Sequence, residues 1–246
     1  MIRLEGLTRS FGDLHVLRGF DLEVATGETV AVIGRSGEGK SVLLKHVAGL
    51  LQPDSGEVWI GDEQVTGADR ERVRRLRLSM GYVFQSSALF DSMTVAENVR
   101  LALRRHGTPA AEIEERARES LETVGLGGWE GRYPAELSGG MRKRAGVARA
   151  VAPRPTYLLY DEPTSGLDPV TTSMIDELVL QLKEDLRATS IVVTHDMRSA
   201  CRVADRIALL REGRVSWLGT PEEIEHTDDA AVKAFVEGRR DLWPDD

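Results

Sequence analysis

The sequence predicts an α/β fold, in which a mostly parallel β-sheet is covered by helices on both faces. Three observations support this prediction. Apolar runs typical of strands alternate with helical patterns along much of the chain, and strands joined by helices tend to pair in parallel. The apolar run 29–33 leads directly into a glycine-rich loop, and the apolar run 156–160 leads into two acidic residues. Open α/β sheets bind ligands beyond the carboxyl ends of their strands, so both places are candidate sites.

The first third of the chain is expected to be rich in strands. The turn signals Gly12-Asp13, Thr26-Gly27 and Asp54-Ser55-Gly56 separate short apolar or alternating runs. The predicted strands are 2–7, 20–24, 29–33 and 57–60, followed by 82–84, which ends at Gln85. A helix is expected over 41–48, because Gly49 ends its apolar pattern.

The middle of the chain is expected to be helical. Helical periodicity covers 94–105, 110–124 and 139–152, so the region 87–152 is predicted to be a helical subdomain inserted into the sheet. After it, strands at 156–160, 190–194, 207–210 and 215–218 alternate with helices at 170–186, at 197–204 and after Pro221. The predicted division is a core of 1–86 and 153–226, the insertion 87–152 and a tail 227–246.

Composition excludes some functional classes. With 41% hydrophobic and 29% charged residues, the chain is typical of a globular protein. The net charge of −8 argues against a nucleic-acid partner, since binding to the phosphate backbone needs excess Lys and Arg. The Arg-rich segment 70–77 is an exception to the net negative charge, and it is interpreted either as a solvated helix face or as a binding patch. The single Cys201 cannot form an intramolecular disulfide, and a cytosolic location is expected.

No membrane crossing or secretory leader is expected from the sequence. No apolar run approaches the roughly 18 residues that a membrane-spanning helix needs. The N-terminus enters an alternating strand pattern at once. If the protein works at a membrane, another chain is expected to supply the crossing.

The glycine-rich loop at 34–41 matches the pattern G-x-x-x-x-G-K-[ST] between a strand and a helix. Its residues are Gly34, Arg35, Ser36, Gly37, Glu38, Gly39, Lys40 and Ser41. Glycines allow backbone N–H groups to close around phosphate oxygens, Lys40 adds a positive charge, and the Ser41 hydroxyl can bind magnesium. The start of the following helix also favours an anion. A glycine turn without a ligand is the alternative interpretation.

Two further patterns carry chemistry. Asp161 and Glu162 end an apolar strand, where Asp161 is placed to hold magnesium and Glu162 to orient or deprotonate an attacking water. Acids that cap the following turn would give the same pattern. Ser138, with Gly139 and Gly140, is suited to capping a helix whose start is open to close approach. A capped helix without a ligand is the alternative there.

Together these motifs resemble the ATP-binding-cassette (ABC) transporter ATP-binding subunits, over nearly the whole chain. The resemblance implies a P-loop NTPase fold, the ABC nucleotide-binding domain, with an N-terminal antiparallel β subdomain and an inserted α-helical subdomain. It places Phe11 against adenine, residues 34–42 including Val42 around the phosphates, Gln85 in the glutamine switch loop, and Ser138, Gly139 and Gly140 in the signature. It also makes Asp161 the magnesium acid, Glu162 the catalytic carboxylate, Asp168 part of a dimer-contact loop and His195 the γ-phosphate histidine.

What the resemblance implies is an ATPase with ATP and Mg²⁺ as cofactors, the metal being held by Ser41, Gln85 and Asp161. Two copies are implied to sandwich two ATP molecules head to tail, at the cytoplasmic face of a membrane, beside a separate integral permease. Taken singly, Phe11 could equally be a packed turn aromatic and His195 a helix-capping or core histidine.

One position departs from the family pattern: Met141 stands where most members have Gln. Met is familiar there in the Mla/Mce-type lipid transport ATPases, which the chain also resembles at 34–42, 85–95 and 235–238. This subgroup implies a permease with a lipid-binding Mce-type partner. An ATPase for an amino-acid, metal or drug transporter is the alternative, followed by a soluble non-transport ABC protein. A nucleotide-binding scaffold without turnover is disfavoured, because Glu162 and His195 are both present.

Two segments carry open alternatives. The apolar residues of 86–95 are either buried packing or a groove for a short cytoplasmic helix of the permease, linked to the nucleotide through Gln85. The tail 227–246 alternates acidic and apolar residues and ends near Trp243. It is either a helix packed on its own domain or on the partner subunit, or a frayed end.

Overall fold

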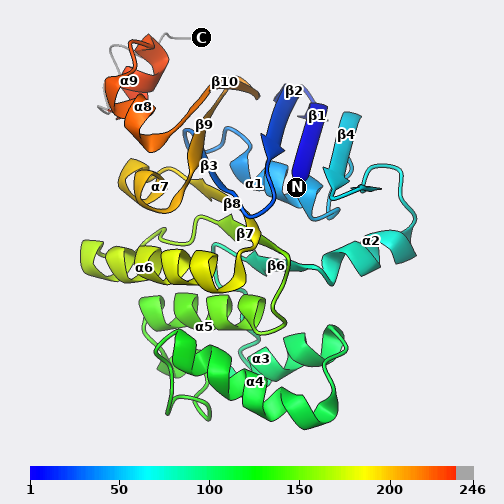
Figure 1. Ribbon diagram of the computed structural model, residues 1–246, viewed down its shortest axis with the longest axis vertical. Coiled ribbons are helices and arrows are strands. Elements are labelled where there is room, and N and C mark those ends of the chain that lie inside the picture. Colours follow the sequence, from blue (N-terminus) through cyan, green and yellow to red (C-terminus); the bar gives the residue numbers. More distant parts are fainter. Residues whose placement is uncertain (237–246) are drawn as a thin grey trace. The chain divides into compact units, whose positions relative to one another are not determined.

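A computed structural model describes residues 1–236 of the chain (Figure 1). It contains two compact units, one formed by Met1–Ala68 together with the chain from Ile191 onward, and one formed by Asp69–Ser190. The first unit carries the glycine-rich loop, and the second carries the helical region and the acidic strand end. The predicted boundaries at 86/87 and 152/153 stay a prediction.

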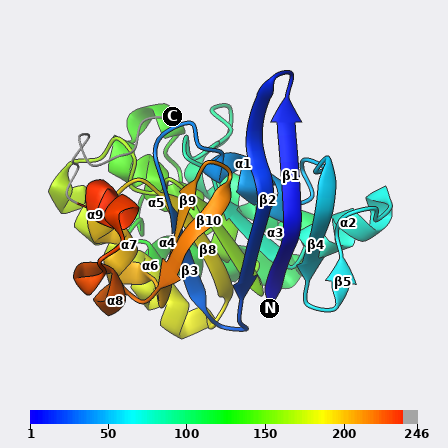
Figure 2. The same ribbon diagram turned by 90° about the horizontal axis from the view of Figure 1, so that it is seen from above.

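An antiparallel sheet opens the first unit. β1 (Ile2–Phe11) pairs with both β2 (Leu14–Val24) and β4 (Ser55–Ile60), and β5 (Glu63–Gln64) extends the order to β2-β1-β4-β5 (Figure 2). The prediction that the second strand starts at residue 20 was wrong. It starts at Leu14, because the Gly12-Asp13 turn forms a tight hairpin and β1 pairs along the full length of β2.

Parallel pairing, as the alternation of strands and helices predicted, positions the glycine-rich loop. β3 (Thr29–Ile33) is buried at all five residues and pairs in parallel with β9 (Arg206–Arg211), to which β10 (Arg214–Gly219) adds an antiparallel edge. α1 (Lys40–Val47) follows the loop and packs against β4. A central strand of a parallel sheet is covered on both faces, so its side chains must be mostly apolar and buried, as those of β3 are.

Three short helices complete the first unit: α7 (Met197–Val203), α8 (Pro221–His226) and α9 (Ala230–Val236). α7 packs on β3, and α8 contacts both α7 and β9. Val232 is fully buried in this core and Phe235 packs against it, so 230–236 forms a helix on its own domain. The rest of the predicted tail, including Trp243, lies outside the described residues.

The second unit combines a parallel strand pair with helices. β6 (Met80–Val83) pairs in parallel with β7 (Tyr157–Asp161), while β8 (Thr189–Thr194) crosses the boundary between the units in the chain. The helices are α2 (Arg70–Arg77), α3 (Val95–Arg105), α4 (Ala110–Thr123), α5 (Gly139–Val151) and α6 (Pro169–Leu186), with a 3-10 turn η1 at Pro134–Glu136. α3, α4 and α5 pack against one another (Figure 1).

Polar caps fix where these helices begin. Thr94 and Glu97 form a capping box at the start of α3, and the Ser138 hydroxyl accepts a hydrogen bond from the Met141 N–H at the start of α5. Such caps satisfy N–H groups that have no partner inside the helix. The predicted capping role of Ser138 is therefore confirmed.

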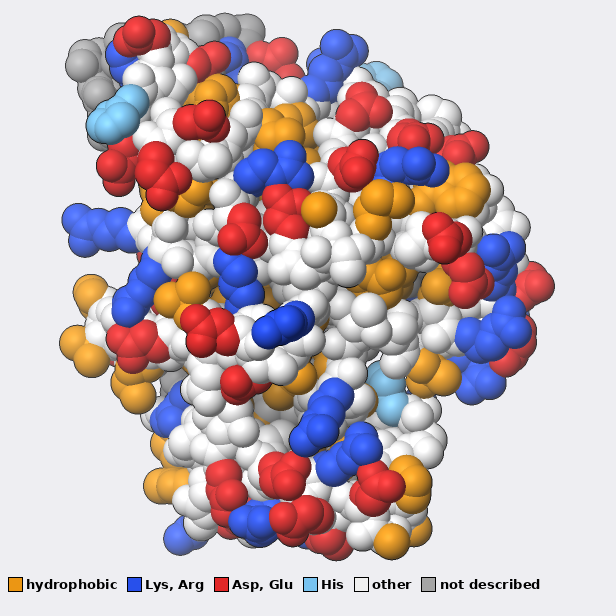
Figure 3. Space-filling model, viewed as in Figure 1, with side chains coloured by type: hydrophobic (Ala, Val, Ile, Leu, Met, Phe, Trp, Pro, Cys, Tyr) orange, Lys and Arg blue, Asp and Glu red, His pale blue; other side chains and the backbone are white. Residues whose placement is uncertain are grey.

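Charged side chains of both signs are mixed on the face of the molecule shown in Figure 3, where Lys and Arg lie interspersed with Asp and Glu. In α2, Val73 and Leu76 are buried while Arg74 pairs with Glu71 at 2.9 Å, as a solvated helix face requires. Within residues 1–236, no helix is both long and apolar enough to span a bilayer.

Gly56 allows β4 to pass a bulge in β1. The pairing shifts register between Glu5 and Thr8, and Gly56 faces that irregularity with φ of +90°. A Cβ atom there would lie 2.4 Å from the Gly6 carbonyl oxygen and 2.5 Å from that of Glu5. Both contacts involve backbone, which cannot rotate away.

We expect Gly56→Ala to lower the free energy of unfolding by about 2 kcal/mol or more, through the collision and the positive φ together. The measurement is urea denaturation followed by circular dichroism. Gly67→Ala is the matched control, because Gly67 has a φ of +74° but a Cβ atom added to it would meet no other atom within 4 Å. Equal losses in the two variants would show that the backbone contact contributes nothing.

Candidate functional site

The glycine-rich loop joins β3 to α1 and requires glycine at two of its positions. A Cβ atom on Gly34 would lie 2.6 Å from the Glu38 carboxylate and 2.7 Å from the Leu210 carbonyl oxygen. Gly39 has a φ of +101°, and its Cβ would lie 2.4 Å from the Val16 side chain. These contacts leave no room for a side chain at either position, so the loop backbone packs closely against its surroundings.

Lys40 is buried at the base of this loop. Its Nζ donates hydrogen bonds to the carbonyl oxygens of Gly34 at 2.7 Å and Arg35 at 3.0 Å. The ammonium group is thus held against the loop by neutral acceptors. Ser41 and Val42 follow in the first turn of α1.

Glu38 introduces an acid into the loop. Its Oε2 accepts a hydrogen bond from the Arg35 N–H at 2.8 Å, and the side chain is half-buried. Burial raises the pKa of Glu38, although the Arg35 hydrogen bond and the charge of Lys40 act in the opposite direction. The sequence pattern named Glu38 as a loop position but did not reveal that its carboxylate folds back onto the loop.

Two other predicted site residues lie in the first unit. Phe11 ends β1 with 45% of its surface exposed, and the Arg9 guanidinium lies over its ring, 4.7 Å from the ring centre. His195 is exposed directly after β8, and the next residue, Asp196, caps α7 by accepting from the Arg198 N–H at 2.9 Å. Asp196, and not His195, therefore caps α7, and His195 lies just after the end of β8.

The acidic strand end in the second unit is buried. Asp161 is the last residue of β7, and its Oδ2 accepts a hydrogen bond from the Tyr82 hydroxyl on β6 at 3.1 Å. Burial, the charge of Asp161 and this hydrogen bond raise the pKa of Tyr82, so the phenol stays protonated as the donor. The Tyr82 ring stacks on Phe84 with centres 4.2 Å apart. The sequence analysis did not predict the hydrogen bond between Tyr82 and Asp161.

Glu162 follows in an unusual backbone conformation. Its φ is +48°, which is uncommon for a residue with a side chain, and it is buried. Its carbonyl oxygen accepts hydrogen bonds from the Lys143 ammonium at 3.1 Å and from the Ser165 N–H at 3.2 Å. Positive φ values held by surrounding contacts are often found at functional sites.

Gln85 joins the same cluster from the end of β6. The residue is exposed, its Nε2 donates to the Ser165 hydroxyl at 3.4 Å, and its carbonyl oxygen accepts from Lys143 at 2.6 Å. Gln85, Asp161 and Glu162, predicted from separate motifs, are thereby linked through Tyr82, Lys143 and Ser165. Neither Tyr82 nor Lys143 carries a sequence signal that points to this role.

The start of α5 lies against the start of α6. Ser138 and Gly139 are exposed, whereas a Cβ on the buried Gly140 would lie 2.4 Å from the Thr171 methyl group. Asp168 caps α6 by accepting from the Thr171 N–H at 3.0 Å and from the Thr171 hydroxyl at 2.5 Å. These hydrogen bonds lower the pKa of Asp168, and the bond from the Thr171 hydroxyl has the largest effect. The glycine at 140 thus allows α6 to approach, whereas the predicted approach of a ligand to this helix start stays a prediction.

The donor chemistry suits magnesium. In the second unit, Asp161 offers a buried carboxylate and Gln85 an amide oxygen. The predicted ligand Ser41 lies in the first unit, so its part in a metal site stays a prediction. Within residues 1–236, no three acidic, His or Cys side chains gather into a metal cluster. Magnesium commonly binds through one or two protein oxygens and keeps waters or phosphates as its other ligands.

An apolar groove of about 520 Å³ lies beside β6 in the second unit. Phe90 is 51% exposed at this groove, and its backbone is fixed by the buried Asn98, which accepts from the Phe90 N–H at 2.8 Å. Within 86–95, Val95 is buried in the core, whereas Phe90 is exposed at the groove, so the segment contains both buried packing and a groove surface. The lining residues are Met80, Gly81, Tyr82, Phe84, Ala88, Phe90, Asn98, Leu101, Ala102, Arg105, His106, Arg149 and Ala150.

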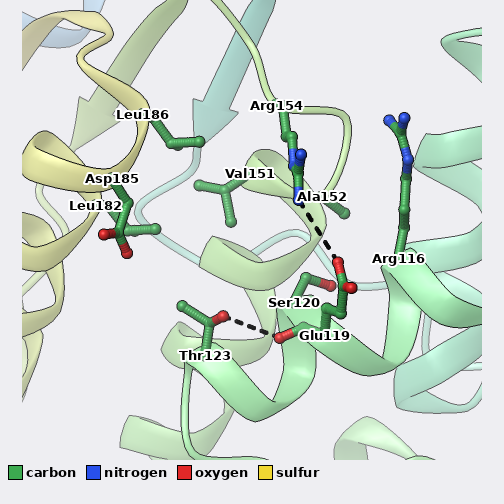
Figure 4. A pocket seen from close by; sticks show the side chains of 10 residues that line it. All are labelled: Arg116, Glu119, Ser120, Thr123, Val151, Ala152, Arg154, Leu182, Asp185 and Leu186. Carbon is green, nitrogen blue, oxygen red and sulfur yellow. Dashed lines mark hydrogen bonds and ion pairs between the residues drawn. The ribbon is translucent and has the colours of Figure 1, made fainter.

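A second depression, of about 370 Å³, lies among α4, the end of α5 and α6 (Figure 4). Leu182, Leu186 and Val151 contribute apolar surface, while Arg154 pairs with Glu119 at 3.6 Å across its edge. None of its lining residues belongs to the predicted site, so it has no part in the assignment below.

Comparisons with known proteins agree with these motifs. The sequence profile of the ABC transporter family matches residues 17–165. A methionine import ATP-binding protein of Cupriavidus necator is 45% identical over 87% of this chain and 64% of its own length. A sulfate/thiosulfate import ATP-binding protein of Gloeobacter violaceus is 41% identical over 96% of this chain and 67% of its own. The chain thus spans about two thirds of these relatives.

Among solved structures, the ATP-binding cassette MJ0796, a dimer in a post-hydrolysis state with ADP and Pi, superposes with a TM-score of 0.82. It is 32% identical, and the match covers 90% of this chain and 99% of that one. The likeness supports the fold over nearly all of the described residues.

We expect Tyr82→Phe to lower the free energy of unfolding by about 1–2 kcal/mol at pH 7, because the buried Asp161 carboxylate loses a hydrogen-bond donor. Urea denaturation measures the change. Tyr133→Phe is the control, since Tyr133 is 47% exposed and its loss of a hydroxyl should cost less than about 0.5 kcal/mol. Unchanged stability in Tyr82→Phe would contradict a stabilising role for this hydrogen bond.

Proposed function

Because the chain belongs to the ABC transporter family as one of its ATP-hydrolysing domains, we propose that it is the ATPase subunit that drives a membrane transporter from the cytoplasmic face. The observation that supports this best is one chain that holds a phosphate loop with a buried Lys40, an acidic strand end at Asp161 and Glu162, and the signature helix start at Ser138.

In this proposal the first unit binds ATP. Phe11 stacks on adenine, the N–H groups of 34–42 surround the phosphates, and Lys40 exchanges its carbonyl acceptors for phosphate oxygens. Anionic oxygens are stronger acceptors than neutral carbonyls, so the exchange is favourable. Glu38 opposes it, because its carboxylate repels the phosphates from within the loop.

The second unit supplies the groups for hydrolysis. Glu162 accepts a proton from the attacking water or orients it, Gln85 positions that water, and His195 of the first unit contacts the γ-phosphate. Magnesium, held through Asp161, Ser41 and Gln85, would neutralise charge on the phosphates. Tyr82 donates to one oxygen of the Asp161 carboxylate and so would fix the orientation of this side chain when it holds the metal.

A second copy completes the site in this proposal. One chain presents two helix starts suited to an anion, at Lys40 and at Ser138, and one nucleotide can bridge the first of one copy and the second of the other. The dimeric MJ0796 structures support such an arrangement. Since the γ-phosphate joins the two copies, its loss on hydrolysis permits opening.

The apolar groove is proposed to receive a short cytoplasmic helix of the permease. Phe90 presents an exposed aromatic ring at this surface, and Tyr82, whose hydroxyl binds Asp161, lines the same groove. Arg105 is exposed at its edge, so an acidic residue on the permease helix would be complementary. Binding there is thereby connected to the acidic strand end through one side chain.

Phospholipids or related lipids are the proposed cargo, with an Mce-type lipid-binding partner. Met141 and the segments 34–42 and 85–95, which resemble Mla/Mce-type ATPases, support this choice. Import of a small solute is the second candidate, because the relatives named above import methionine or sulfate. Mass spectrometry of molecules that co-purify with the intact transporter distinguishes the two.

We expect Glu162→Gln to reduce ATP turnover by at least about 100-fold, because the substitution keeps size and hydrogen bonding but removes the base. With ATP present, the variant should elute as a dimer in gel filtration. Glu184→Gln, an exposed change on α6, should retain wild-type turnover. A Glu162→Gln enzyme with near-normal turnover would refute the assigned role.

Phe90→Asp should disrupt co-purification with the permease, because a charge would be buried in an apolar contact. Leu50→Asp is the matched control, since both side chains are 51% exposed but Leu50 lies outside the groove. Both variants should unfold at wild-type temperatures. If Phe90→Asp still bound the permease as tightly as the control, the groove would not be the docking site.

A further inference from the structure

One face of α5 holds the chain segment that follows β6. Lys143, Gly146 and Arg149 are spaced by three residues and so lie along one side of the helix. Lys143 donates to the Gln85 carbonyl oxygen at 2.6 Å, and Arg149 donates to those of Ser87, at 2.8 Å, and Ala88. Between these two cations, the missing side chain of Gly146 lets the backbone of Ser87 approach.

This approach is close. A Cβ atom on Gly146 would lie 3.2 to 3.3 Å from the Cβ, Cα and carbonyl oxygen of Ser87. Ser87 and Ala88 have φ values of +64° and +46°, so the loop is bent against the helix in an uncommon conformation. The contacts therefore fix the loop to α5 rather than leaving it free beside the helix.

Lys143 differs from Arg149 because it also reaches the other strand end. Its Nζ donates to the Glu162 carbonyl oxygen at 3.1 Å, and only 7% of its surface is exposed. One ammonium group therefore binds the backbone of Gln85 and that of Glu162, which belong to the ends of two different strands. Both hydrogen-bond acceptors are main-chain atoms, so these bonds fix backbone position, while the nearby charges of Glu162 and Asp161 favour the ammonium group.

Burying an ammonium group is unfavourable unless hydrogen bonds compensate. A core position needing only volume would be filled more favourably by Met or Leu. The Glu162 backbone, with its φ of +48°, also needs contacts to hold it. A buried lysine at this position is therefore better suited to placing the two backbone segments than to filling the core.

We propose that Lys143 is a positioning residue for ATP hydrolysis: its ammonium group fixes Glu162 and Gln85 relative to each other and to the signature helix α5. The inference rests on the proposed roles of Glu162 and Gln85. When α5 shifts, the two groups move with it as one assembly. Lys143 itself contacts neither nucleotide nor water in this role.

The test is Lys143→Met in the full-length chain, measured as steady-state ATPase activity against ATP concentration. We expect kcat to fall at least about tenfold while KM for ATP changes less than about threefold, because the substitution leaves the phosphate loop and the Ser138 helix start unaltered. Lys143→Gln keeps an N–H donor and should recover part of the lost kcat. A drop in folded yield or melting temperature with kcat unchanged would overturn the proposal.

Arg144→Met is the matched control. Arg144 lies on the same helix and also donates to two backbone carbonyls, those of Val124 at 2.9 Å and Gly125 at 3.1 Å, which belong to the loop after α4. Its loss should destabilise the fold comparably but reduce kcat much less than Lys143→Met. Equal losses of kcat in both variants would indicate general damage and reject the positioning role.

A double-mutant comparison separates this inference from the proposed function. If Lys143 acts through Glu162, adding Lys143→Met to Glu162→Gln should lower the residual turnover less than about twofold, against about tenfold in the wild-type background. A full additional tenfold loss would overturn the positioning role. Normal turnover in Glu162→Gln alone would instead reject the assignment of the base, whatever Lys143→Met does.

Discussion

Backbone carbonyl groups in loops set the constraint on which the candidate site depends. A buried carbonyl outside a helix or sheet needs a donor, and in these loops cationic side chains supply it. The pairs are Lys40 with Gly34 and Arg35, Lys143 with Gln85 and Glu162, and Arg149 with Ser87 and Ala88. Burial lowers the pKa of Lys143, while the nearby charges of Glu162 and Asp161 act in the opposite direction and so support its ammonium group together with the carbonyl oxygens.

The two lysines use the same chemistry to different ends. Both acceptors of Lys40 belong to adjacent residues of one loop, so the side chain can leave them together when a phosphate offers stronger acceptors. The acceptors of Lys143 belong to two strand ends, and releasing them would separate those ends. Lys40 is therefore suited to exchanging its carbonyl acceptors for a ligand, whereas Lys143 is suited to keeping its acceptors bound. Glu38 adds a charge that makes the exchange at Lys40 less favourable.

Local chemistry explains which features could be predicted from sequence. The loop at 34–41, the Ser138 cap and the acidic strand end are short motifs whose residues act on their own neighbours. The start of β2 at Leu14 was missed because pairing with β1, not local pattern, extends that strand. The Tyr82–Asp161 and Lys143–Glu162 contacts join residues 79 and 19 positions apart, and no spacing rule reports such packing. The lipid subgroup rests on marker residues alone.

Helix α5 carries the signature at its start and part of the groove lining near its end. Ser138 caps its first turn, Lys143 binds the two strand ends, and Arg149 and Ala150 line the groove near its last turn. At 1.5 Å per residue, its 13 residues span about 20 Å. A helix whose Lys143 and Arg149 side chains bind neighbouring segments cannot tilt at one end without displacing those segments. In the proposed dimer, a partner's nucleotide at Ser138 and a permease helix at Phe90 would thus act on one element, with Gln85 and Glu162 attached between them.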